Sequence, residues 1–210
     1  MPGLAYSLGA APPPEPPLLA AAEKDERGRW RTRRGIGPVR AVQRYATPAP
    51  DGVLLLQSGK TTDEGIAPVL GSVTVFYDVV QRIGRAPFFR DWAIVGDLSA
   101  GPRQTAYRWT AYADTVLLVV EPTWKSVLTA RRIRNIAASI SGARVGVVAN
   151  KLARAADADE IASRLGEPVL AAVPVDEAVS EAERSGLPLL DHAPDAPATV
   201  AIARLAERLS

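Results

Sequence analysis

An aspartate and a glycine follow one of the apolar runs of this sequence. The run Ala93–Gly96 leads into Asp97, and Gly101 comes four residues later. A carboxylate that leaves a buried strand can hold Mg²⁺ through water, and a nearby glycine lets a backbone amide approach a terminal phosphate. As a lone motif, an ordinary turn built on the aspartate explains the pattern better. Asp97 is therefore a candidate catalytic and Mg²⁺-holding residue, and Gly101 a candidate nucleotide-binding residue, only in combination with other features.

Two further apolar runs also end in polar residues. Asn150 and Lys151 follow the run 145–149. An asparagine amide offers a donor and an acceptor in one plane, which matches the edge of a purine base, and a lysine stem can lie along the base. Pro174 and Asp176 follow the run 169–173, where proline ends the strand and Asp176 can cap the next helix. Taken singly, Asn150 and Lys151 are more simply interpreted as part of an exposed polar loop. Pro174 and Asp176 are more simply interpreted as residues that end a strand and begin a helix.

The elements that must position these residues alternate along the chain. Continuous apolar runs of four to six residues are typical of strands buried on both faces, and they occupy residues 53–56, 93–96, 115–120, 145–149 and 169–173. Apolar residues at three- and four-residue spacing predict helices over 66–83, 102–113, 124–140, 157–165, 176–186 and 197–209. This alternation predicts an α/β fold with a doubly wound, mostly parallel sheet, in which ligands bind at the carboxyl ends of the strands.

The first fifty residues differ from the rest. They are rich in proline and carry an arginine cluster between Arg27 and Arg34 without strand or helix periodicity. We expect residues 1–50 to be loop-rich, with one short helix near residues 18–24, and residues 51–210 to form one α/β domain. The arginines suggest a nucleic-acid arm, but adjoining acidic residues favour a solvated charged loop.

Composition excludes several classes of protein. Of 210 residues, none is cysteine and one, His192, is histidine, which excludes disulfide scaffolds, thiolate zinc sites and histidine-rich metal clusters. Lys and Arg number 25 against 23 Asp and Glu, so bulk charge indicates neither nucleic acid nor membrane as a partner. No apolar run reaches the ~20 residues of a spanning helix. We expect a cytoplasmic protein.

The order of the three polar features is more specific than any one of them. An aspartate follows one predicted strand, Asn-Lys follows the second strand after it, and Pro-x-Asp follows the next strand again. This order resembles the nucleotide site of MinD/ParA-like P-loop ATPases. Within that class the chain is most similar to the carbon monoxide dehydrogenase maturation ATPases, which insert nickel. The stretches that carry the resemblance are Asp91–Gly101, Ala113–Thr123, Ser126–Ile133, Val145–Lys151 and Pro174–Leu190. The resemblance implies a P-loop NTPase fold, ATP and Mg²⁺ as cofactors, and a homodimer.

The glycine-rich phosphate loop of this class is absent from the sequence. Gly59-Lys60-Thr61 looks similar, but the glycine that should stand five positions before it falls on Leu54. Asp63 and Glu64 would also place two carboxylates beside the phosphates, where like charge is unfavourable. The metal-binding Cys-x-Cys pair of the maturation ATPases is missing too, because the corresponding stretch is Gly65-Ile66-Ala67-Pro68. The resemblance therefore supports the ATPase class more strongly than nickel handling, and the client protein is not identified.

The first residues suggest where the loop belongs. Gly3–Gly9 resembles the segment that follows the second strand of these ATPases, so the phosphate loop is expected upstream of Pro2. Our hypothesis is that Met1 is an internal methionine or that the gene is truncated. We then expect the chain alone to fold poorly and not to hydrolyse ATP, because strands beside the lost one have no ladder partners. The alternatives are a degenerate, non-hydrolysing interaction protein of the same fold and a ParA-like nucleic-acid-binding protein.

Overall fold

The computed structural model describes residues 2–11, 17–58, 67–106, 108–110, 112–140 and 142–209. Backbone contacts divide the chain into two compact units. One contains the described residues up to Ala93 together with Gly186–Pro188, and the other contains Ile94–Ser185 and Leu189 to the end. The domain boundary expected after residue 50 stays a prediction.

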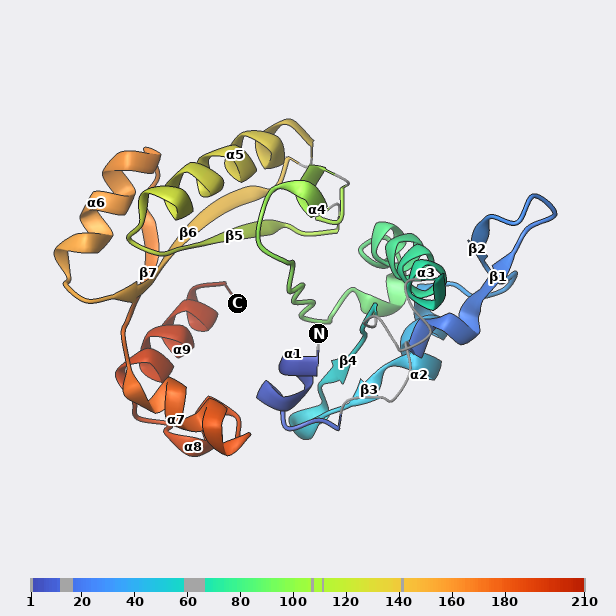
Figure 1. Ribbon diagram of the computed structural model, residues 1–210, viewed down its shortest axis with the longest axis horizontal. Helices are drawn as coiled ribbons and strands as arrows, with labels where there is room; N and C mark the ends of the chain where they lie inside the picture. The colour runs from blue at the N-terminus through green and yellow to red at the C-terminus, as the bar shows by residue number, and fades with distance from the viewer. Residues whose placement is uncertain are drawn as a thin grey trace. The chain divides into compact units, whose positions relative to one another are not determined.

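A parallel three-stranded sheet forms the centre of the second unit (Figure 1). Its strands are β5 (Thr115–Val120), β6 (Arg144–Leu152) and β7 (Val169–Pro174), in the order β5-β6-β7. Their residues are mainly β-branched or aliphatic, which suits a pleated surface covered on both sides. These are the last three strands that the apolar runs predict.

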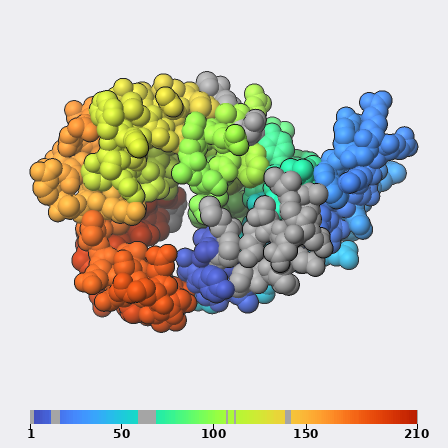
Figure 2. Space-filling model, viewed as in Figure 1, coloured from blue at the N-terminus to red at the C-terminus, as the bar shows by residue number. Residues whose placement is uncertain are grey.

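Two helices cover one face of this sheet. Helices α5 (Trp124–Ile140) and α6 (Ala156–Leu165) contact each other and pack on the strands. Their yellow and orange surfaces adjoin in the space-filling view (Figure 2). Val120 and Val147 of the strands pack with Val127 of α5 and Ile161 of α6, all at most 1% exposed. Each such side chain contributes about 1.5–3 kcal/mol when it is fully buried. This cluster is the main core of the unit.

The opposite face is covered by α9 (Pro197–Leu209). Ala198 and Leu205 of this helix pack with Val148 of β6 and Val173 of β7. Helices therefore lie on both faces of a parallel sheet, which confirms the predicted doubly wound α/β class. The unit is completed by three shorter helices, α4 (Arg103–Ala106), α7 (Glu177–Ser185) and α8 (Leu189–His192).

The run 93–96 is not a strand, which corrects the sequence prediction. Residues 92–99 have no regular hydrogen-bonded structure, and the side chains of Ile94 and Val95 are 36% and 94% exposed. An apolar run becomes a strand only when a neighbour satisfies its backbone groups. Among the described residues, β5 pairs only with β6, and Leu117 and Val119 on β5 are exposed as well. The prediction for 102–113 is also too long, since α4 is the only helix among the described residues of that range.

The first unit has more regular structure than its composition indicates. Its elements are α1 (Pro2–Ser7), η1 (Pro17–Ala21), β1 (Ala22–Lys24), β2 (Trp30–Thr32), α2 (Pro38–Tyr45), β3 (Thr47–Pro48), η2 (Pro50–Gly52), β4 (Leu54–Leu55), α3 (Ala67–Ile83) and η3 (Pro87–Phe89). The expected parallel strand at 53–56 is instead the two-residue β4, antiparallel to β3. The expected helix near residues 18–24 is a 3-10 turn followed by β1.

An aspartate turn explains the hairpin of β1 and β2. The Asp25 carboxylate accepts hydrogen bonds from the backbone amides of Arg27 and Arg29, at 3.0 and 2.8 Å, and closes the loop between the two strands. Trp30 of β2 then packs on α3, where an added Cβ at Gly71 would lie 3.0 Å from its ring. Leu18, Val75 and Val79 form the buried centre of this unit.

No helix among the described residues is long and apolar enough to cross a membrane.

Candidate functional site

Asn150 and Lys151 form a bulge near the carboxyl end of β6. Ala149 pairs with Ala172 and Leu152 pairs with Pro174, so three steps along β6 face two steps along β7. The extra residue is a β-bulge, a feature that re-aims side chains and is frequent beside active sites. Lys151 has φ 56°, which lies in the left-handed region that side-chain-bearing residues rarely adopt.

An ion pair joins this bulge to the end of the neighbouring strand. The Nζ of Lys151 lies 2.7 Å from Oε1 of Glu121, the first residue after β5. The hydrogen bond to Glu121 and the charge of its carboxylate raise the pKa of Lys151 above its ordinary value. Lys151 is therefore a cation throughout the neutral pH range. The contact of Glu121 with Lys151 was not predicted from the sequence.

The backbone of Glu121 is itself held by the start of α5. The amide of Glu121 donates to Oγ of Ser126 at 3.0 Å, and the amide of Thr123 donates to the carbonyl of Glu121 at 2.7 Å. The hydroxyl of Thr123 accepts from the amide of Ser126, as in a helix cap. Pro122 fixes one further backbone angle. Glu121 thus extends towards Lys151 from a constrained turn.

Asp176 is engaged by two helices. Its Oδ1 accepts a hydrogen bond from the amide of Ala178 in α7, and its Oδ2 accepts one from the amide of Ala198 in α9, both at 3.0 Å. Pro174 ends β7, and the amide of Val175 donates to the carbonyl of Leu152 beside the bulge. Both carboxylate oxygens of Asp176 therefore have structural partners, in line with the capping role that the sequence also allows.

Asp97 and Gly101 lie on the exposed segment that precedes α4. Asp97 is exposed and stands in backbone without regular structure, while Gly101 has φ 100° and open space where a Cβ would be. The nearby Tyr112 contacts Gly96, and burial raises the pKa of its phenol. The structure thus places Asn150, Lys151, Pro174 and Asp176 at the carboxyl ends of β6 and β7, and Asp97 and Gly101 on a segment that has no strand to fix it.

Two other sequence motifs cannot be placed in the fold. Gly59-Lys60-Thr61 and Gly65-Ile66 lie outside the described residues. Within the described part of the chain, no group of three or more His, Asp or Glu side chains is placed to hold a metal ion.

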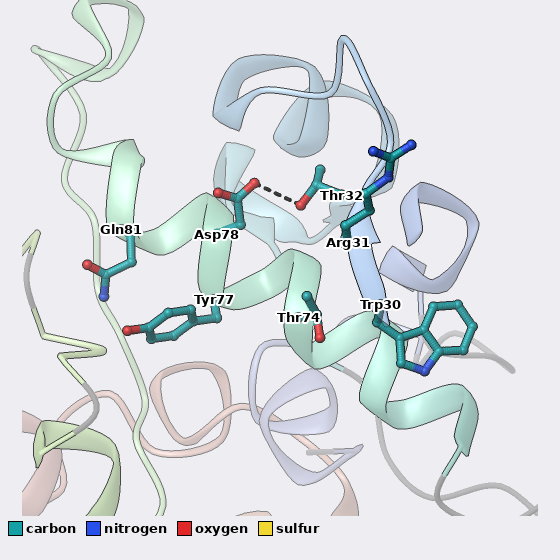
Figure 3. A pocket seen from close by; sticks show the side chains of 7 residues that line it. All are labelled: Trp30, Arg31, Thr32, Thr74, Tyr77, Asp78 and Gln81. Atoms are coloured by element: carbon teal, nitrogen blue, oxygen red, sulfur yellow. Dashed lines mark hydrogen bonds between the residues drawn. The ribbon is translucent and has the colours of Figure 1, made fainter. Parts of the chain in front are cut away.

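A shallow groove of about 390 Å³ lies in the first unit, between β2 and α3 (Figure 3). Trp30 and Tyr77 line it, and Asp78 projects from α3. The Asp78 carboxylate accepts a hydrogen bond from Thr32 at 2.8 Å and pairs with Arg82, so its charge already has partners. None of the residues predicted to bind a ligand lines this groove.

Comparisons with known proteins agree with the architecture. No family model matches the sequence. Over 104 residues the chain is 36% identical to an uncharacterized ATP-binding protein of Methanocaldococcus jannaschii. That match covers 48% of this chain and 40% of the relative, so the chain spans less than half of the relative's length.

Several solved structures have the same fold. The septum site-determining protein MinD of Pyrococcus horikoshii, complexed with Mg-ADP, matches 99% of this chain and 78% of its own chain, with a TM-score of 0.68 and 14% identity. The cell division ATPase MinD of Pyrococcus furiosus and a ParA family ATPase of Chlorobium tepidum each match 99% of this chain and 80% of their own, with TM-scores of 0.70 and identities of 19% and 20%. The chain therefore has the fold of MinD/ParA P-loop ATPases.

Proposed function

We propose that this chain provides the base-binding half of an ATP site in a MinD/ParA-like ATPase. The observation that carries this proposal is the bulge at Asn150–Lys151, because it breaks the regular strand where a planar amide and a cationic side chain stand at the carboxyl edge of the sheet. Ligands of open α/β sheets bind at that edge. The ATP-binding relative and the MinD structure with Mg-ADP support the choice of an adenine nucleotide.

Each candidate residue has a role in this proposal. The Asn150 amide would read the edge of the adenine ring, and the aliphatic stem of Lys151 would lie along the base. Pro174 and Asp176 shape the neighbouring strand end through the helix caps described above. Asp97 would hold Mg²⁺ and act as the catalytic carboxylate, and Gly101 would leave room for the terminal phosphate.

The phosphate end of the site needs residues that the sequence does not contain. Residues 1–210 include no glycine-rich loop of the required spacing. We infer that a strand bearing such a loop pairs with the edge of β5 that has no partner strand among the described residues, and that it orders the exposed segment around Val95. Without it, the 210-residue chain binds adenine through Asn150 and does not turn over Mg-ATP. Bound Mg²⁺ would stabilise charge on the terminal phosphate in the complete site.

The wider role belongs to the same proposal. We expect the complete ATPase to be a cytoplasmic homodimer that acts as a maturation or partitioning-type ATPase. The sequence does not identify its client protein. Nickel handling is the weaker form of this proposal, because the sequence has no cysteine.

An interaction protein of the same fold is the second candidate function. It is favoured by the exposed apolar residues Leu117 and Val119 on β5, which offer a binding surface without any nucleotide chemistry. A nucleic-acid role is disfavoured, because Arg29 and Arg31 of the hairpin pair with Asp25 and Glu23.

Titration of the 210-residue chain with adenosine, ADP and guanosine tests the proposal by calorimetry. Because the chain has no phosphate loop, we expect the affinities for adenosine and ADP to lie within a few-fold of each other. Guanosine should bind at least about tenfold more weakly, because hydrogen-bond donors left without a partner on the base are costly. Equal binding of guanosine, or no binding of adenosine, would favour the interaction protein.

A further inference from the structure

Lys151 adopts a backbone conformation that its residue type disfavours. Its φ of 56° is one of three positive values among the non-glycine residues that the structure describes. Such conformations persist only where the surroundings enforce them, and they cluster at ligand sites. The left-handed turn of Lys151 therefore needs a structural cause.

The residues on either side of the bulge fix its ends. Ala149 is fully buried, and Leu152 is 6% exposed within the cluster beneath α5 and α6. The carbonyl of Leu152 accepts a hydrogen bond from Val175 at 3.0 Å. Because of these contacts, the three steps from Ala149 to Leu152 must fit beside only two steps of β7, from Ala172 to Pro174. The contacts do not determine the backbone angles of Asn150 and Lys151.

The side chain of Lys151 reaches one strong partner outside its own strand. Its ammonium lies 2.7 Å from the Glu121 carboxylate, and the amide and carbonyl of Glu121 are held by Ser126 and Thr123 of the α5 start. An ion pair to a glutamate whose backbone is held restricts where the Lys151 backbone can turn. Because Asn150 and Lys151 are joined by one planar peptide bond, the ion pair also restricts the orientation of Asn150.

We propose that Glu121 is a positioning residue, which acts through its ion pair with Lys151 to keep the bulge in the left-handed conformation that presents Asn150 to the base. This inference rests on the proposed function. Glu121 itself does not touch the nucleotide. The pair is exposed, with side chains 66% and 42% accessible, so salt screens it.

Four variants of the full 210-residue chain separate conformation from charge. Glu121→Gln removes the negative charge of the tether and keeps the shape of the side chain. Lys151→Ala and Lys151→Gly both remove the ammonium, but only glycine enters the left-handed region without strain. Glu160→Gln is the matched control, since Glu160 forms an exposed pair with Arg164 on α6.

The first measurement is hydrogen–deuterium exchange of peptides that cover residues 145–152. We expect Glu121→Gln and Lys151→Ala to raise exchange about two- to fivefold, the range that an exposed ion pair supports. Lys151→Gly should raise exchange less than Lys151→Ala does, because glycine enters the left-handed region without strain. The Glu160→Gln control should stay near the wild-type rate. No change in Glu121→Gln, or an equal change in the Glu160→Gln control, would overturn the positioning role.

The second measurement is the affinity for adenosine, which carries no charge, at low and high salt. Wild-type affinity should fall with added salt towards that of Glu121→Gln, whose affinity should be about two- to fivefold weaker and insensitive to salt. Lys151→Gly should bind adenosine more tightly than Lys151→Ala. If the wild type binds no adenosine, the proposed function fails and the ligand role of Glu121 fails with it, while the exchange rates still decide whether Glu121 holds the bulge. If the wild type binds and Glu121→Gln binds equally at all salt concentrations, only the positioning role is wrong.

Discussion

The hydroxyl of Tyr112 lies directly against the backbone of Gly96, so that a Cβ added at Gly96 would stand 1.7 Å from the Tyr112 oxygen. This contact links the exposed segment before Asp97 to the loop that leads into β5. A residue with any side chain at position 96 must displace the phenol ring, which is half-buried.

We therefore expect Gly96→Ala to lower the free energy of unfolding by about 1–3 kcal/mol, the usual cost of overpacking. Tyr112→Phe in the same chain should recover part of the loss, because the next ring atom would be 3.1 Å from the new Cβ. Urea unfolding of the four combinations measures this coupling. Gly3→Ala, with nothing within 4 Å, is the control. Additive effects of the two substitutions would show that the contact is not formed in solution.

Gly146 lies beneath two leucines of the neighbouring strands. An added Cβ there would be 2.4 Å from Leu170 and 3.1 Å from Leu117. We expect Gly146→Ala to destabilise the chain by about 1–3 kcal/mol and Leu170→Ala in the same background to relieve the clash. Thermal unfolding monitored by circular dichroism gives the comparison. If Gly146→Ala melts at the wild-type temperature, the parallel register of β5, β6 and β7 described above is incorrect.

The two caps formed by Asp176 predict a large effect for a partly exposed residue. Asp176→Ala removes a carboxylate that accepts from the first turns of both α7 and α9. Each cap typically contributes about 1 kcal/mol, so we expect a loss of about 2 kcal/mol in unfolding free energy. Asp176→Asn keeps one acceptor oxygen and should lose about half as much. Asp195→Ala, outside both caps, serves as the control. A change below about 0.5 kcal/mol for Asp176→Ala would contradict the two-helix role.

The Asp25 turn predicts a pH dependence of the β1–β2 hairpin. The backbone hydrogen bond from Arg29 is the main cause that lowers the pKa of Asp25, with further contributions from the Arg29 side chain and from Arg27. Because the pKa is lower in the folded state, the stabilisation is complete above the ordinary Asp range and is lost as pH falls through the lowered value. Amide signals of Arg27 and Arg29 followed by NMR should shift in acid in the wild type and not in Asp25→Asn. A titration of these signals at or above the ordinary Asp range would contradict the turn.

Sequence patterns predicted the longer helices and the last three strands well. The bounds of α3, α5, α6 and α9 fall within one residue of the expected ranges, because their apolar residues repeat at helical spacing over ten or more residues. Strands β5, β6 and β7 were found because each run is aliphatic and each has a partner.

The failures have a common physical cause. Whether 53–56 and 93–96 become strands depends on which chain lies beside them, and an apolar run does not encode its neighbour. The bulge at Lys151 likewise follows from the register of β6 against β7, and the Glu121 contact depends on how β5 and β6 align. The roles of Asp97 and Gly101 stay predictions, since the segment that carries them has no strand partner.

The most direct test of the account is adenosine binding by the Asn150→Ala variant beside its matched control Asn135→Ala, which changes an exposed asparagine on α5. Because two hydrogen bonds of about 0.5–1.5 kcal/mol each would be lost, we expect Asn150→Ala to bind adenosine roughly tenfold more weakly in calorimetry. Asn135→Ala should bind as the wild type does. Equal adenosine affinity in wild type, Asn150→Ala and Asn135→Ala would contradict the claim that the bulge at Asn150–Lys151 reads the base.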